Sequence, residues 1–159
     1  MARATDTIML RGVHTLALDA KGRLAVPSRY RSVLQAIAEG QLVVTIDTEA
    51  RCLLIYPLDE WEVIQEKIAA LSSFNRAARR IQRLLIGHAT DVEMDGSGRV
   101  LIPPPLRDYA SLDKKIVLLG QGNKFEVWSE DLWAQTRDAY LDEAGDEDTL
   151  TAELEQISL

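Results

Sequence analysis

The chain has 159 residues, 47% of them hydrophobic and 27% charged, a balance typical of one ordinary globular domain or two very small ones. No apolar run approaches the roughly 20 residues of a membrane-spanning helix, and residues 1–8 lack the hydrophobic core of a secretory signal. The single cysteine, Cys52, excludes an intrachain disulfide and a cysteine-rich metal site, and a buried position in a cytoplasmic protein fits it.

The net charge of −7 is unevenly distributed. Seven of the 25 acidic residues lie beyond Leu141, where there is no basic residue, so 18 acidic residues accompany the 18 basic ones elsewhere. Residues 1–31 hold six basic and two acidic residues. Positive charge is therefore local, which is what a phosphate backbone responds to, and we expect the acidic tail to be solvated.

The first predicted elements are a β-hairpin and a helix. Residues 13–18 alternate as a strand, residues 19–22 form a turn, and residues 23–26 return as a strand that Pro27 ends. Gly22 supplies the positive φ that such a turn requires. The helix that follows is expected to be capped by Ser28 and ended by Gly40, with the apolar stripe Tyr30, Val33, Leu34 and Ile37.

Further strands are expected near residues 42–46 and 52–56, followed by two helices. Asp59 and Glu62 resemble a capping box at the start of one helix, and Asn75 is expected to cap the other, which runs over residues 76–86. The second helix carries a basic face formed by Arg76, Arg79, Arg80 and Arg83. A solvated face, a phosphate contact and a contact with a neighbouring subunit all remain open for it.

The second half of the chain repeats this order. Strands are predicted near residues 90–94, 99–102, 116–119 and 125–128, and Ser129 begins a last helix. The stretch Asp19-Ala-Lys-Gly-Arg-Leu-Ala-Val-Pro-Ser-Arg-Tyr-Arg31 aligns with Asp95-Gly-Ser-Gly-Arg-Val-Leu-Ile-Pro-Pro-Pro-Leu-Arg107. Asp, Gly, Arg, Pro and a second Arg recur in register, which indicates an internal duplication. One repeat of about 45 residues is too small to fold alone, so two copies are expected to pack about a pseudo-twofold axis.

The two Asp-x-x-x-Arg turns are the main candidates for binding. Asp19 and Asp95 are expected to stabilise the turns by accepting backbone N–H groups and by pairing with Arg23 and Arg99. Lys21 adds a base beside Arg23, and a guanidinium group suits both phosphate oxygens and the O6/N7 edge of guanine. For Arg29, Arg31 and Arg107, the sequence favours neither a solvated charge nor a phosphate contact over the other.

Enzyme chemistry finds little support in the sequence. Gly96-Ser-Gly98 lacks the third glycine of a dinucleotide-binding loop and leads into a strand. His14 and His88 have no partners at metal-binding spacing and are expected to be structural. An acid–base pair of Asp19 and Asp95 would need a shared cleft, which two hairpin tips do not suggest. No catalytic residue, metal, cofactor or small-molecule substrate is therefore predicted.

Five motifs in chain order resemble the MraZ family. They are Arg11-Gly12, Leu18-Asp19-x-Lys-Gly-Arg-Leu-x-Val-Pro27, Arg83-Leu-Leu-x-Gly-His-Ala89, Met94-Asp-Gly-x-Gly-Arg99 and Asn123-Lys-Phe-Glu126. The resemblance covers the chain from Met9 to about Leu141. It implies an α+β fold in which tandem AbrB-like (SpoVT-AbrB) swapped-hairpin half-barrels form one pseudo-twofold β-barrel with flanking helices. The corresponding divisions are residues 13–60 and 89–132 for the repeats, 61–88 for connecting helices, and 133–159 for a C-terminal helix and acidic tail.

The resemblance also implies a function. Such a protein is expected to form a ring-shaped homo-oligomer at the nucleoid and to bind direct repeats of double-stranded DNA. The implied target is the promoter of its own operon, the division and cell-wall gene cluster, which it would repress. The family's DNA-reading motifs fall on the two turns, the second of which has Ser97 in place of lysine. The candidate DNA-binding residues are Lys21, Gly22, Arg23, Arg29, Ser97, Arg99 and Arg107.

A protein-interaction role is the alternative. AbrB-like barrels also serve as antitoxins, in which a tail masks a partner enzyme, and the acidic segment 142–159 is a candidate for that part. Such chains usually carry one half-barrel and dimerise, whereas this chain holds both halves. The regulator is the favoured interpretation.

Overall fold

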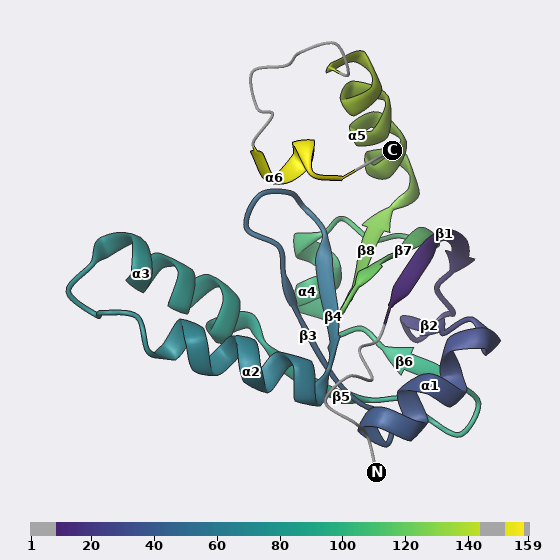
Figure 1. The fold of residues 1–159 in the computed structure, drawn as a ribbon. Coiled ribbons are helices and arrows are strands. Elements are labelled where there is room, and N and C mark those ends of the chain that lie inside the picture. Colours follow the sequence, from purple (N-terminus) through teal and green to yellow (C-terminus); the bar gives the residue numbers. More distant parts are fainter. Residues whose placement is uncertain (1–8, 144–151, 158–159) are drawn as a thin grey trace.

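The computed structural model describes residues 9–143 and 152–157, which contain two antiparallel sheets with helices around them (Figure 1). The predicted α+β class is confirmed. The predicted solvated acidic tail includes Asp146, Glu147 and Asp148. These three residues lie outside the described residues. In the described part of the chain, no helix is long and apolar enough to cross a lipid bilayer.

The larger sheet has six strands in the order β1-β7-β8-β4-β3-β5, and every neighbouring pair is antiparallel. The strands in this order are β1 (Leu10–Ala17), β7 (Lys115–Gly122), β8 (Phe125–Ser129), β4 (Leu53–Pro57), β3 (Gln41–Ile46) and β5 (Thr90–Glu93). β1 of the first repeat corresponds to β5 of the second, β3 to β7, and β4 to β8. The two strands of each such pair lie equally far from opposite edges of the sheet. The duplicated sequence has therefore produced a symmetric strand order, with β4 beside β8 at its centre.

The register at that centre shows the same symmetry. Leu54 lies opposite Glu126, and this pair is flanked by Leu53 opposite Val127 and Ile55 opposite Phe125. Phe125 and Val127 are the counterparts of Leu53 and Ile55 in the second repeat, so the two flanking pairs exchange when the repeats are exchanged. An approximate twofold relation therefore passes through the central pair.

The second sheet consists of two short strands, β2 (Arg23–Ala25) and β6 (Arg99–Leu101), which pair with each other. The local pattern predicted that each would return along the strand before its own turn, whereas the family resemblance implied swapped hairpins. In the structure, β1 pairs with β7 and β5 pairs with β3, so each repeat places its hairpin strands against the other repeat. Burial favours this arrangement, since Leu24 and Val100, which lie opposite each other in the β2–β6 pair, are both completely buried in it.

The main core draws on residues of both repeats. Its fully buried members include Leu24, Leu34, Leu42, Leu53, Val100, Ile102, Ile116, Leu118 and Val127. Sequence-distant strands thus share one hydrophobic interior.

The helices α1 (Ser28–Ala38) and α4 (Pro104–Tyr109) follow β2 and β6, and α5 (Glu130–Asp142) follows β8. The predicted Ser129 cap of α5 is confirmed, because its side chain accepts a hydrogen bond from the Leu132 N–H at 3.4 Å. The predicted Ser28 cap is wrong. Pro27 occupies the capping position with φ −52° and ψ 138°, so Ser28 is already inside the first turn and its side chain makes no cap hydrogen bond.

The helices α2 (Leu58–Ala69) and α3 (Arg76–Ile81) form an arm that projects from the sheets (Figure 1). The predicted capping box of α2 is wrong because Pro57 precedes its first residue without a side-chain cap. The predicted Asn75 cap of α3 is confirmed by hydrogen bonds from the N–H groups of Ala77 and Ala78 at 2.8 and 3.2 Å.

A π-helical turn, η1 (Gln82–Ile86), continues α3 toward the sheet. The Gln82 amide donates to the carbonyls of Ile68 and Leu71, which holds the two helices of the arm together. The hydroxyl of Thr45, a fully buried polar residue on β3, donates to the carbonyl of Leu85 at 2.7 Å. The arm is therefore fastened at its base to the larger sheet. A short helix, α6 (Ala152–Glu155), lies near the C-terminus.

Candidate nucleic-acid interface

The first turn is organised around the Asp19 carboxylate. Its Oδ1 accepts the backbone N–H groups of Lys21 and Arg23, both at 2.9 Å, while its Oδ2 pairs with Arg23 Nε at 2.7 Å. Gly22 closes the turn by donating its N–H to the Asp19 carbonyl at 3.0 Å, with φ +85°. The acid and the arginine therefore define the shape of the turn together.

The second turn repeats this network atom for atom. Asp95 Oδ1 accepts the N–H groups of Ser97 and Arg99 at 2.9 Å, and its Oδ2 pairs with Arg99 Nε at 3.2 Å. Gly98, with φ +76°, donates its N–H to the Asp95 carbonyl at 2.9 Å. The duplication thus preserves a specific hydrogen-bond arrangement as well as residue identity.

Both carboxylates are held in the charged form. Hydrogen bonding from the Arg23 N–H, with further contributions from the Arg23 side chain and the Lys21 N–H, lowers the pKa of Asp19 to about 2. The pKa of Asp95 is lowered by the corresponding bond from the Arg99 N–H and by the same kinds of neighbour. Both turns therefore keep their ion pairs throughout the physiological pH range.

The turns present their cations at the surface. The Arg23 side chain is 26% exposed and that of Arg99 is 40% exposed. In each, Nε is the atom paired with the aspartate, and the guanidinium group has four further N–H donors at its terminal nitrogens. Lys21 and Ser97 are exposed at equivalent positions, whereas Gly22 is buried. The first turn is the more basic of the two.

The structure separates the three remaining candidate arginines. Arg29 is exposed and its guanidinium lies 4.9 Å from the centre of the Tyr30 ring, a cation–π distance. Arg31 is partly buried and donates from Nε to the Val26 carbonyl at 2.7 Å. Arg107 is also partly buried and packs against Gly22. Only Arg29 is therefore as open to solvent as Lys21.

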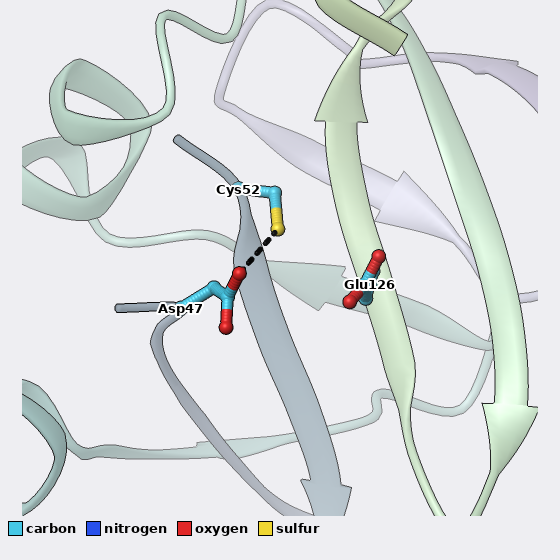
Figure 2. A group of neighbouring side chains, drawn as sticks. All are labelled: Asp47, Cys52 and Glu126. Carbon is cyan, nitrogen blue, oxygen red and sulfur yellow. Dashed lines mark hydrogen bonds between the residues drawn. The ribbon is translucent and has the colours of Figure 1, made fainter. Parts of the chain in front are cut away.

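A group that the sequence did not predict lies on the larger sheet. Asp47, Cys52 and Glu126 bring one carboxylate, one thiol and one further carboxylate within 4.8 Å of one another (Figure 2). These residues follow β3, precede β4 and lie on β8, so no spacing along the chain signals them. They are the residue types that bind divalent cations.

Hydrogen bonds connect the members of this group with one another and with a neighbouring residue. Burial raises the pKa of the Cys52 thiol well above its usual value, and the thiol donates to Asp47 at 3.8 Å. Burial also raises the pKa of Glu126, whose Oε1 accepts the Trp128 indole N–H at 2.8 Å. Cys52 is completely buried, as predicted.

The histidines do not join that group. His14 meets the Tyr30 ring edge-on with 5.8 Å between ring centres, and Nδ1 of His88 lies 2.7 Å from the Leu84 carbonyl. Their contacts agree with the structural roles expected for them.

The arm carries the second basic surface. Arg76, Arg79, Arg80 and Arg83 line a groove of about 640 Å³ together with Leu84 and Phe74, whose side chain is 99% exposed. Among the described residues, none of these four arginines forms an ion pair. The groove is therefore a cationic surface with an apolar edge.

Comparison with known proteins decides the family. The family model described as "MraZ protein, putative antitoxin-like" matches this chain twice, over residues 9–84 and 85–154. The chain belongs to the MraZ family. The two matches meet between residues 84 and 85, so each covers one copy of the duplicated turn.

Similar proteins extend over almost the full chain. The protein named transcriptional regulator MraZ from Thioalkalivibrio sulfidiphilus is 54% identical over 151 residues, and that from Legionella pneumophila (strain Paris) is 55% identical over 152 residues. The protein of the same name from Alkalilimnicola ehrlichii is 56% identical over 151 residues. In each case the alignment covers 95% of this chain and 100% of the relative. The family resemblance is confirmed, and MraZ is a family of regulators and not of enzymes.

Proposed function

We propose that this MraZ-family chain is a transcriptional regulator that binds double-stranded DNA through its two Asp-x-x-x-Arg turns. The observation that carries the proposal is the repeated network at Asp19 and Asp95, which presents one arginine at each turn in a fixed orientation. Such preorganisation suits recognition, because a positioned guanidinium loses little conformational freedom when it binds. The similar proteins named as transcriptional regulators support the same conclusion.

Each arginine is suited to DNA in two ways. Its free terminal N–H groups match either two phosphate oxygens or the O6 and N7 acceptors of guanine in the major groove. Lys21 adds a phosphate contact at the first turn, and Arg29, on the helix after β2, extends the exposed positive charge. At the second turn Ser97 offers a hydroxyl in place of the ammonium group. We therefore expect the second turn to contribute less to the electrostatic attraction for DNA.

A ring-shaped homo-oligomer would make these small contact sites effective. A single turn offers too few contacts for tight specific binding, whereas several identical turns on regularly repeated DNA sites gain affinity through effective concentration, often roughly 10²–10⁴-fold. We therefore propose that the two sheets close as one barrel in each subunit and that the ring acts at the nucleoid in the cytoplasm. Its proposed target is a set of promoter direct repeats upstream of its own operon of division and cell-wall genes, which it represses.

A mobility-shift titration at fixed salt tests this function, using the DNA immediately upstream of the protein's own gene. Arg23→Ala should weaken repeat-dependent binding strongly, to an affinity that the titration can still measure, while leaving the oligomer intact. Arg137→Ala is the matched control, because Arg137 is another exposed arginine paired with an aspartate, Asp138, but lies on α5. Unchanged affinity in Arg23→Ala would remove this residue from the site, and no specific binding by folded wild type would reject the function.

An antitoxin-like interaction role is the second candidate. It is favoured by the family description and by the run of acidic residues beyond Leu141. Deleting residues 142–159 separates the two functions. A regulator should keep its promoter affinity after the deletion, whereas an antitoxin should lose its protein partner.

A further inference from the structure

The two arginines that end the duplicated stretch, Arg31 and Arg107, contact the turns of the opposite repeats. Arg107, on α4 of the second repeat, packs so closely on Gly22 that a Cβ at that glycine would lie 2.5 Å from its Cζ and Nη1. Arg31, on α1 of the first repeat, packs on Gly98, where a Cβ would overlap its Nε and Cδ. Each turn needs glycine for its positive φ, and the absence of a Cβ there lets the arginine side chain lie against the turn.

Backbone hydrogen bonds connect the same elements. The N–H of Val26 donates to the Gly98 carbonyl at 2.8 Å, and the N–H of Ile102 donates to the Gly22 carbonyl at 3.0 Å. Arg31 Nε donates to the Val26 carbonyl at 2.7 Å. Arg31 thus binds the strand end that holds the second turn and also covers the glycine of that turn.

We propose that Arg31 and Arg107 are positioning residues, each of which holds the DNA-binding turn of the other repeat in its binding geometry. Arg107 supports the turn of Asp19 and Arg23, and Arg31 supports the turn of Asp95 and Arg99. The proposal rests on the function proposed above and assigns to Arg107 a role distinct from direct DNA contact. It also gives the exchange of strands a functional consequence, because each turn, shaped by its own Asp–Arg network, is supported by an arginine of the other repeat.

The two supports are not identical. Arg107 Nε is buried and has no hydrogen-bond partner among the described residues, whereas its counterpart Arg31 Nε is bonded to Val26. An unbonded buried donor contributes less to a fixed geometry than a bonded one. The more basic first turn therefore has the weaker support. We expect Arg31→Ala to disturb the second turn more than Arg107→Ala disturbs the first turn.

A double-mutant cycle on promoter affinity distinguishes positioning from direct contact. Arg107→Ala should weaken binding about tenfold, within the range for coupled neighbours, and should add nothing further when Arg23 is already alanine. It should remain additive with Arg99→Ala. Arg31→Ala should show the reverse pattern, non-additive with Arg99→Ala and additive with Arg23→Ala.

The conservative variant supplies a second readout. Lysine keeps the charge but has no planar group to lie on glycine, so Arg107→Lys should bind as weakly as Arg107→Ala. A direct phosphate contact would instead be largely retained in Arg107→Lys. It would also give additive losses with both turn variants and a salt dependence lower by about one counterion in Arg107→Ala. Any of these three results would overturn the proposal.

A measurement without DNA separates this inference from the proposed function. Amide hydrogen exchange in the folded oligomer should become faster at Gly22 and Arg23 in Arg107→Lys, and at Gly98 and Arg99 in Arg31→Lys. In each variant, exchange at the turn of the substituted residue's own repeat should not change. This cross-repeat pattern supports positioning even if wild type binds no promoter, an outcome that would reject only the DNA function. Unchanged exchange at the opposite repeat's turn would reject positioning itself.

Discussion

Leu24→Ala is the sharpest test of the interlocked fold. Leu24 is 0% exposed and lies opposite Val100, also 0% exposed, in the two-stranded sheet to which each repeat contributes one strand. Truncating it removes core packing at the point where the repeats meet. If the exchange of strands holds the halves together, this one change must destabilise the whole molecule.

The expected loss follows from the complete burial of Leu24. A buried Leu→Ala substitution costs about 2–5 kcal/mol, and about 3 kcal/mol is expected here because Leu24 is completely buried in the main core. For a chain of this length each kcal/mol lowers the melting temperature by roughly 2–4 °C, so Tm should fall by about 6–12 °C. Leu101→Ala is the matched control, since Leu101 lies on the partner strand with 48% exposure and should cost about 1 kcal/mol or less.

Thermal and urea unfolding at one fixed protein concentration would measure both variants, with circular dichroism as the signal. Fixed concentration matters because oligomerisation contributes to apparent stability. A loss in Leu24→Ala no greater than in Leu101→Ala would refute the reasoning. The β2–β6 pair would then contribute no more to the stability of the protein than an exposed surface position does.

Two further predictions follow from shifted pKa values. Because the pKa of Asp19 is lowered from 3.8 to about 2, its stabilising effect is fully present above pH 3.8 and is lost as pH falls through about 2. An NMR titration of its side-chain carboxyl should show that midpoint; a midpoint near 3.8 would mean that the turn network does not form. Cys52, buried and with a raised pKa, should resist iodoacetamide at pH 8 until the protein is unfolded in guanidinium, as followed by mass spectrometry. Rapid labelling of the native protein would contradict that burial.

Local sequence patterns determined much of this protein. Positions of strands and helices follow from apolar periodicity, and the two turns follow from Asp, Gly and Arg at fixed offsets. The Asn75 and Ser129 caps were also predictable, because a cap depends on a few neighbouring residues. The Ser28 cap was not, since Pro27 already supplies the backbone geometry that starts a helix.

The duplication gave the candidate site, and its chemistry followed from residue type. Arg23 and Arg99 could be selected because each shares a tight turn with an aspartate. Arg31 and Arg107 could not be separated from solvated charge in the same way. Their contacts are with glycines of the other repeat, and no spacing along one segment reports a contact between repeats.

The sequence by itself determined the two turns, the order of elements and the need for both halves to build a core. Only the tertiary structure decided which strands pair. A strand with alternating apolar residues can form its backbone hydrogen bonds and bury its apolar face beside any strand whose register matches. The pairing of β2 with β6 then placed Arg107 on Gly22, and the pairing of β4 with β8 brought Glu126 close to Asp47 and Cys52. Contacts of this kind arise from the exchange between repeats, and local patterns carry no record of it.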